Sequence, residues 1–187
     1  MSVWLFGYGS LIWRPEFSYL EARPARLQGY ARRFWQGSHD HRGLPDAPGR
    51  VVTLVADPGS HCEGMAYRID ADTADSVLTA LDYREKNGYQ RLQLSLRLLD
   101  RHQQEVSALV YLATPENFAF LGPAPTAQIA GQIHRSCGPS GHNRDYLFDL
   151  ARVLRDLSIC DPHVFELEAA VRALDHQGEP FGHRLQP

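Results

Sequence analysis

The chain has 187 residues and a formal net charge of −3, and 43% of its residues are hydrophobic, 10% aromatic and 22% charged. The hydrophobic content excludes intrinsic disorder. The negative net charge argues against a general nucleic-acid-binding protein, which usually has an excess of basic residues. No apolar run is long enough for a transmembrane helix. The three cysteines include no CxxC pair, which favours a reducing compartment over a disulfide scaffold, so we expect a cytoplasmic protein whose residues 1–187 form one domain.

The first part of the chain is predicted to consist mainly of strands. Runs of apolar residues, some alternating with polar ones, predict six of them, at 2–6, 27–37, 50–56, 63–69, 89–98 and 106–112. We expect the turn Asp57-Pro58-Gly59 to end the third strand, which makes the fourth its hairpin partner. Six strands with mostly short connections indicate an antiparallel or mixed sheet, closed into a small barrel.

Helices are predicted between and after the strands, at 73–83, 126–136, 143–157 and 161–174. Their apolar residues follow the i, i+3, i+4 spacing of an amphipathic helix. We expect Asn143 to cap the third helix, and Asp161 with Pro162 to begin the fourth. The tail at 176–187 has no periodic pattern and is expected to be flexible. The predicted fold class is α+β, a strand-rich body with helices packed around it.

Two glycines flank Tyr8 directly after the first strand, in the segment Phe6-Gly7-Tyr8-Gly9-Ser10-Leu11. Glycine lets the backbone turn tightly, and consecutive N–H groups in such a turn can hold a carboxylate or an oxyanion. The segment lacks the third glycine of a dinucleotide-binding loop, the lysine of a phosphate-binding loop and the glycine spacing of a nucleophile elbow. Taken alone, the pattern is most often a simple strand-terminal turn.

A second candidate lies in residues 81–89, where the first helix gives way to the next strand. Asp82 and Glu85 are three residues apart, so on a helix they would share a face, as paired carboxylates do. A carboxylate at this point is placed to act as a general base if burial or a like charge raises its pKa. Arg84 and Lys86 equally indicate a solvated turn, and the spacing alone favours the turn.

Two further loops contain residues that could bind a ligand. His39 and His41 are metal-ligating types, but the sequence shows no motif that supplies further ligands, so we expect no metal site. The arginines and aromatic residues around them fit an anionic small-molecule substrate better than a single-strand nucleic-acid groove. Residues 138–146 form a glycine-rich turn before a helix, which can hold an anion but is typical of an ordinary helix start.

Ordered motifs carry a more specific pattern than any single loop. They lie at 4–13, 32–38, 40–43, 48–54, 81–86, 88–89, 121–125 and 138–141, with Asn143 and Tyr146 following. In their order and their residues these motifs resemble the ChaC family of γ-glutamylcyclotransferases, the glutathione-specific branch. The resemblance covers roughly residues 3–174, and it departs at His39, where the family pattern has a small hydroxyl residue.

The resemblance implies a γ-glutamylcyclotransferase-like fold, a small mixed or antiparallel β-barrel with surrounding helices. It also implies that glutathione is degraded to 5-oxoproline and cysteinylglycine. In that reaction the α-amino nitrogen of the substrate attacks its own γ-carbonyl carbon, so no cofactor and no metal are implied. We expect neither a nucleic-acid nor a membrane partner, and a monomer is favoured.

The same resemblance assigns roles to individual residues. It implies Glu85 as the catalytic base and a set of substrate contacts from Tyr8, Gly9, Ser10, Leu11, Gln36, Arg42 and Tyr146. Two alternatives stay open. One is a cyclotransferase for another γ-glutamyl amine or amino acid, and the other is a non-catalytic γ-glutamyl-binding protein that regulates cation transport.

Overall fold

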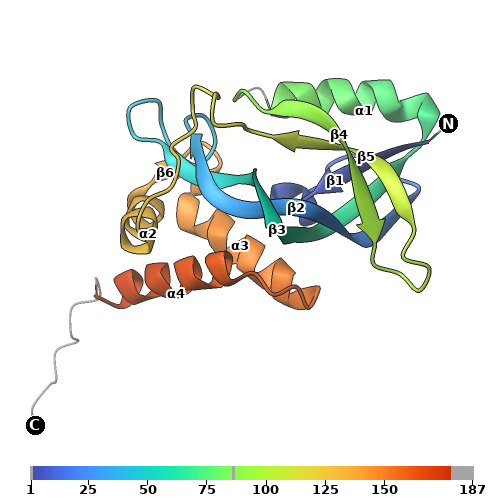
Figure 1. Cartoon of the computed structure of the whole chain (residues 1–187). Coiled ribbons are helices and arrows are strands. Elements are labelled where there is room, and N and C mark those ends of the chain that lie inside the picture. Colours follow the sequence, from blue (N-terminus) through green and yellow to red (C-terminus); the bar gives the residue numbers. More distant parts are fainter. Residues whose placement is uncertain (1, 86, 178–187) are drawn as a thin grey trace, which may run out of the picture.

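A closed β-barrel forms the body of the computed structural model, which describes residues 2–85 and 87–177 (Figure 1). Around the barrel the strand order is β1-β3-β2-β4-β5. The bounds of these strands are β1 Val3–Gly7, β2 Glu21–Ser38, β3 Gly49–Ile69, β4 Gln90–Leu98 and β5 Glu105–Leu112. All neighbours pair antiparallel except β1 and β5, which are parallel. The expected α+β class and the mixed barrel are confirmed.

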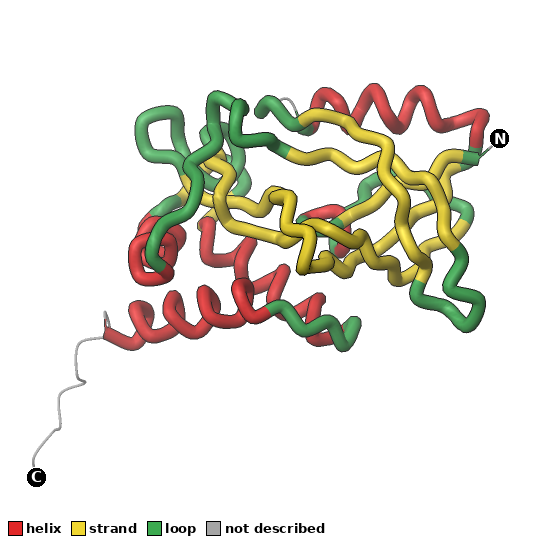
Figure 2. The backbone as a smooth tube through the Cα atoms, viewed as in Figure 1, coloured by secondary structure: helices red, strands yellow, loops and turns green. Residues whose placement is uncertain are grey.

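Strands β2 and β3 form one long ribbon, and this corrects the prediction for residues 50–69 (Figure 2). The predicted turn at Asp57-Pro58-Gly59 does not end the strand, and the two predicted halves pair with β2 rather than with each other. Residues 57–60 lie opposite Gly29 alone, between the pairs Gln28–His61 and Tyr30–Ala56. They form a bulge, which turn residues tolerate without ending the ladder. Six predicted strands thereby become the five of the barrel.

Strand β2 also begins earlier than predicted, at Glu21 instead of Leu27. Its first six residues are three charged residues, two alanines and Pro24, so they carry no apolar pattern. They are held by ion pairs to neighbouring strands, among them Arg26 to Glu63 on β3, with 2.6 Å between Nη2 and Oε1. Charged pairs across the strands therefore extend the sheet where hydrophobic periodicity gives no signal.

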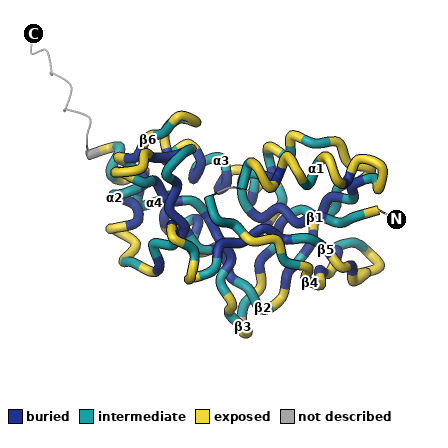
Figure 3. The backbone as a smooth tube through the Cα atoms, turned by 90° about the horizontal axis from the view of Figure 1, so that it is seen from above, coloured by how far each residue is buried: buried dark blue, intermediate teal, exposed yellow. Residues whose placement is uncertain are grey.

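Helix α1 (Ala71–Arg84) lies against the outside of the barrel and leaves most of its outer face exposed (Figure 3). Asp70 caps its start by accepting the N–H of Asp72 (3.0 Å). On the inner face of this helix, Ala74 and Leu81 form a hydrophobic cluster with Leu5 of β1, and this cluster is separate from the main core. In β1, Leu5 therefore faces α1 while its neighbour Phe6 belongs to the main core, as strand alternation requires.

Three more helices pack together beside the β2–β3 ribbon, as Figure 1 shows: α2 (Thr126–Arg135), α3 (Asn143–Asp156) and α4 (Pro162–Gln177). A short hairpin of β6 (Cys137–Gly138) and β7 (Gly141–His142) joins α2 to α3. Asp161 begins α4 as predicted, since its Oδ1 accepts the N–H of Val164. The predicted tail starts too early, because His176 still belongs to α4, and residues 178–187 lie outside the described part. None of the described helices is both long and apolar enough to cross a membrane.

Asn143 does not cap α3, contrary to the prediction from the sequence, but binds the backbone of β3. His142 occupies the cap position, and Asn143 is the first residue of α3, with a fully buried side chain. Its Oδ1 accepts the N–H of Arg50 (2.6 Å) and its Nδ2 donates to the carbonyl of Arg50 (2.8 Å). A single amide thus pairs both backbone groups of one β3 residue and fixes α3 to the barrel.

Candidate active site

The cavity lies at the end of the barrel where β1 and β5 end and β4 begins. Its outer hollow has a volume of about 300 Å³ and is walled by α1, η1 (Ser10–Ile12), the loop after β2 and the β6–β7 turn. A smaller hollow of about 40 Å³ adjoins it on the barrel side, where Tyr8, Gly9 and Leu11 form part of the wall. Four residues line both hollows, namely Ser10, Glu85, Tyr89 and Tyr146. The two hollows therefore form one stepped site.

The turn after β1 forms one wall, as its glycine-rich sequence suggested. Its backbone hydrogen bonds run from the N–H of Ile12 to Gly9 (3.0 Å) and from Trp13 to Ser10 (3.2 Å). The first N–H groups of a helix have no acceptor within that helix. The N–H groups of Gly9, Ser10 and Leu11 come before the first bonded amide, that of Ile12, and therefore make no hydrogen bond within η1. The backbone comes close to the opposite wall here, because a Cβ on Gly9 would lie 2.9 Å from the Tyr146 hydroxyl.

Glu85 ends α1 and places its carboxylate between the two hollows. Its side chain is 19% exposed, and its Oε1 lies 3.6 Å from Nε of Arg84. Burial raises the pKa of Glu85 above the ordinary value, the Arg84 guanidinium lowers it, and the Asp40 carboxylate raises it again. A carboxylate with a raised pKa is suited to take up a proton and release it during one reaction.

Asp82 does not share this position, so the structure does not support the paired-carboxylate hypothesis. Its Oδ1 accepts the hydroxyl of Tyr111 (2.5 Å), and it lines neither hollow. The acidic neighbour that affects the pKa of Glu85 is Asp40, from the loop after β2. That pairing joins residues 45 positions apart in the sequence, which spacing arguments do not detect.

Three tyrosines surround the carboxylate. Burial raises the pKa of Tyr8, Tyr89 and Tyr146, and the charge of Glu85 raises each of them further, so all three stay protonated. Tyr8 donates to the carbonyl of Tyr111 (2.6 Å) and Tyr89 to that of Val52 (2.9 Å). Tyr146 donates to no carbonyl within the described residues, and the Val52 backbone lowers its pKa, so the hydroxyl proton of Tyr146 is available to a ligand.

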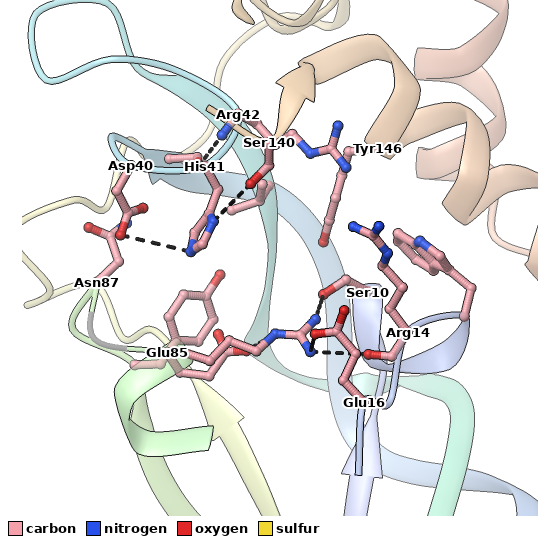
Figure 4. A pocket seen from close by; sticks show the side chains of 15 residues that line it. Ser10, Arg14, Glu16, Asp40, His41, Arg42, Glu85, Asn87, Ser140 and Tyr146 are labelled. Atoms are coloured by element: carbon pink, nitrogen blue, oxygen red, sulfur yellow. Dashed lines mark hydrogen bonds and ion pairs between the residues drawn. The ribbon is translucent and has the colours of Figure 1, made fainter. Parts of the chain in front are cut away.

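Ser10 is similarly prepared as a donor. Arg84 Nη2 donates to Ser10 Oγ (2.8 Å), so the hydroxyl proton of Ser10 is not used in that bond. Arg84 also donates to Glu16 Oε2 (3.2 Å) at the edge of the cavity. One guanidinium thus connects the end of α1 to Ser10 and Glu16 on the opposite wall, and Figure 4 labels these two acceptors.

A buried ion pair supports the same turn from behind. Arg32 on β2 is 2% exposed, and its Nε donates to the carbonyl of Tyr8 (2.7 Å). Its Nη1 binds Asp161 Oδ2 at 2.6 Å, at the start of α4. The position of Gly9 and Ser10 therefore depends on an arginine that does not itself line the cavity.

The loop after β2 and the β6–β7 turn complete the outer hollow. Arg42 donates to the carbonyl of His142 (3.0 Å) and its guanidinium carbon lies 5.9 Å from the centre of the Tyr146 ring. His41 Nδ1 is 3.1 Å from Ser140 Oγ and its Nε2 is 3.9 Å from Asp40 Oδ2. His39 packs against Phe118 instead. No group of three or more metal-ligating side chains occurs within residues 2–85 and 87–177.

Gln36 is the one predicted contact residue that lines neither hollow. It is fully buried, and its Nε2 donates to the carbonyl of Asn87 and to Asn117 Oδ1, both at 3.3 Å. Sequence reasoning proposed no site role for several lining residues, namely Trp13, Arg14, Glu16, Val51, Asn87 and Tyr89. They come from different elements, and Trp13, Val51 and Tyr89 could have been noticed because each lies within a matched motif. The fold and the site define a small-barrel protein with a ligand cavity at one end of the barrel and a largely buried carboxylate in that cavity.

Comparison with known proteins assigns this barrel to a family. A model of the ChaC-like protein family matches residues 3–174. A Danio rerio protein named glutathione-specific gamma-glutamylcyclotransferase 1 is 42% identical over 176 residues, which cover 92% of this chain and 90% of that protein. A Schizosaccharomyces pombe protein named glutathione-specific gamma-glutamylcyclotransferase is 42% identical, covering 91% and 93%.

Among solved structures, a yeast gamma-glutamyl cyclotransferase specific to glutathione superimposes with a TM-score of 0.89 and 30% identity, covering 97% of this chain and 99% of that one. The chain belongs to the ChaC-like protein family, and its fold is the γ-glutamylcyclotransferase-like fold.

Proposed function

We propose that the protein degrades glutathione by closing the γ-glutamyl group into a ring, which releases 5-oxoproline and cysteinylglycine. The observation that carries the proposal is the largely buried Glu85 carboxylate where the two hollows meet, facing the Tyr8–Leu11 turn. The two relatives and the yeast structure described above bear names specific to glutathione. The three free cysteines support a reducing compartment, for which we propose the cytoplasm.

In the proposed complex, the γ-glutamyl part occupies the inner hollow and the cysteinylglycine part the outer one. The amide N–H groups of the Tyr8–Leu11 turn and the Ser10 hydroxyl face the γ-glutamyl group. Gly9 permits this close approach because it has no Cβ atom. Leu11 supplies an apolar wall, Tyr146 a hydroxyl donor, and Arg42 a cation on the outer side. Gln36 acts indirectly, by holding the carbonyl of Asn87.

The reaction begins when Glu85 removes a proton from the α-ammonium group of the substrate. The freed nitrogen attacks the γ-carbonyl carbon, a new C–N bond closes the five-membered ring, and the carbonyl oxygen gains negative charge. Donors from the turn and from Ser10 stabilise that charge, and one such donor is typically worth about 2.7–4 kcal/mol. Glu85 then returns its proton to the cysteine nitrogen, the intermediate collapses, and the bond to that nitrogen breaks. The carboxylate, ionised again, takes the second proton from the ring nitrogen, which leaves the neutral ring amide of 5-oxoproline, and passes it to the released amine, which leaves as an ammonium group.

This chemistry needs little beyond positioning and one proton carrier. Nucleophile and electrophile belong to one molecule, and holding them in a near-attack arrangement can lower the barrier by several kcal/mol, within a ceiling of about 7–11 kcal/mol. Since no protein nucleophile, electron transfer or Lewis acid enters the scheme, we propose that no cofactor is required.

A substrate panel separates this function from its nearest alternatives. Glutathione is expected to give a larger kcat/KM than γ-glutamyl amino acids or γ-glutamylamines, with 5-oxoproline as the common product. A higher kcat/KM for one of the simpler γ-glutamyl compounds would reassign the substrate. Tight glutathione binding without any 5-oxoproline would favour a non-catalytic binding protein.

The pH dependence follows from the groups around Glu85. The carboxylate must be ionised to accept a proton, so kcat/KM falls as the pH falls through its pKa, which lies above the ordinary value of about 4.3. Because the Asp40 carboxylate raises that pKa, Asp40→Asn is expected to shift the acid limb to lower pH. Arg84 lowers the same pKa, so Arg84→Gln is expected to shift the limb to higher pH. Profiles of kcat/KM from pH 4 to 9 measure both shifts. If the acid limb moved in the same direction in both variants, or in the direction opposite to the one expected for each, Glu85 would not be the titrating group.

A further inference from the structure

Three arginine side chains line the outer hollow, and they differ in what they already bind. Arg84 donates to Ser10 and to Glu16. Arg42 donates to the carbonyl of His142 and lies over the Tyr146 ring. Arg14 lines the same hollow, yet its guanidinium has no hydrogen-bond or ion-pair partner among residues 2–85 and 87–177. Among the described arginines of this cavity, Arg14 is thus the one whose guanidinium has no protein partner and is free to bind a ligand.

The backbone of Arg14 is fixed although its guanidinium is free. Its N–H donates to the carbonyl of Ser10 (2.8 Å), and its own carbonyl accepts from Arg84 Nη1 (3.1 Å). The preceding residue, Trp13, packs edge-on against Tyr146, with 5.5 Å between the ring centres. Binding an anion therefore requires no movement of the Arg14 backbone, because hydrogen bonds already hold it on both sides.

Charge is distributed unevenly across the cavity. Figure 4 shows Arg14 on the Tyr146 side and Asp40 with Asn87 on the opposite side. Asp40 Oδ1 is buried and has no hydrogen-bond partner among the described residues. Its carboxylate repels a second carboxylate, so an anionic group in the outer hollow is directed towards Arg14.

Arg14 lines the outer hollow but not the inner one. Under the proposed function, on which this inference rests, the γ-glutamyl part reacts at the inner hollow and the cysteinylglycine part stays outside. Before cleavage the cysteine nitrogen is a neutral amide, and the thiol is largely protonated at neutral pH. The glycine carboxylate therefore carries the full charge of that part.

We propose that Arg14 binds the glycine carboxylate of glutathione and makes the enzyme select γ-glutamyl peptides that end in a free carboxylate. A guanidinium can bind a carboxylate through two parallel N–H···O bonds, which gives direction as well as affinity. Arg14 is thereby a specificity-determining residue, separate from the proton transfer at Glu85.

The test compares glutathione with its glycinamide, in which a neutral amide replaces the terminal carboxylate. For the wild type, kcat/KM measured as 5-oxoproline release is expected to be about 10- to 100-fold higher for glutathione, the value of one charge-assisted contact. Arg14→Gln is expected to bring the ratio of the two kcat/KM values close to one. Arg14→Lys keeps the positive charge but cannot form the two parallel N–H···O bonds, so it is expected to give an intermediate ratio. Arg152→Gln, on the exposed face of α3, is the matched control and keeps the wild-type ratio.

The substrate comparison needs no variant, so it decides the inference even if Arg14→Gln does not fold. Equal wild-type kcat/KM for the two substrates would overturn the role of Arg14 while leaving the proposed function intact. An equal loss on both substrates in Arg14→Gln would also overturn it, by assigning Arg14 to a part of the substrate that both share. A wild type that releases no 5-oxoproline from either compound would overturn the proposed function, and the inference with it.

Discussion

Glu85→Gln is expected to lower kcat for glutathione by about 10²–10⁴-fold, the usual contribution of a general acid–base group. The glutamine side chain has the same shape but cannot accept the ammonium proton or return it to the leaving nitrogen. Glutathione should still bind, because the amide occupies the same volume between the two hollows. Steady-state kinetics measure the loss of turnover, and isothermal titration calorimetry measures the retained affinity.

The same substitution has an opposite effect on stability. The pKa of Glu85 is raised in the folded state, so the stability associated with its protonated form is present below the unfolded pKa and is lost as pH rises through the folded pKa. At neutral pH the ionised carboxylate is therefore a cost to the fold, and Glu85→Gln should unfold at the same or a higher temperature than the wild type. Glu105→Gln, at an exposed position on β5, is the matched control and keeps full activity. Near wild-type turnover by a folded Glu85→Gln would exclude Glu85 as the base.

Gly9→Ala is expected to lower kcat/KM for glutathione by about 10²-fold, the cost of displacing a reacting group by roughly 1 Å. A Cβ at this position would lie 2.9 Å from the Tyr146 hydroxyl and 2.9 Å from Val52 Cγ2. To relieve these contacts the turn and Tyr146 must separate, and both belong to the wall of the inner hollow. Gly9→Val adds two methyl groups at the same place and should abolish glutathione binding.

Gly59→Ala provides the control for this prediction. A Cβ there meets only Asp57 Oδ1, at 3.9 Å, in the bulge of β3 far from the cavity, so activity should not change. Circular dichroism melting curves show whether the Gly9 variants are folded. A folded Gly9→Val that binds glutathione normally would contradict close approach of substrate to the turn.

Local patterns predicted much of the fold because most of its elements obey them. The leucines of β4 alternate as expected, with Leu96 and Leu98 fully buried. The interruption at Asp57-Pro58-Gly59 is a strong turn signal, but pairing with β2 on both sides outweighs it and keeps β3 continuous. Hydrogen bonding between strands distant in sequence therefore overrides the local preference, which periodicity cannot anticipate.

The site was predictable in outline and not in detail. Motif order implied Glu85 and the Tyr8–Leu11 turn, and the structure places them on facing walls of one cavity. Asp40 as the neighbour of Glu85 and Arg14 as an unpaired cation emerge only when α1, the loop after β2 and η1 are brought together. Gln36 illustrates the converse, since a residue within a matched motif lies behind the cavity wall and holds Asn87.

The central claim is most directly tested by following the products of glutathione by mass spectrometry, with purified protein treated with EDTA and given no cofactor. We expect 5-oxoproline and cysteinylglycine in equal amounts from the wild type and neither above background from Glu85→Gln. If free glutamate appeared in place of 5-oxoproline, or if a folded wild type released no product, intramolecular cyclisation at this site would be contradicted.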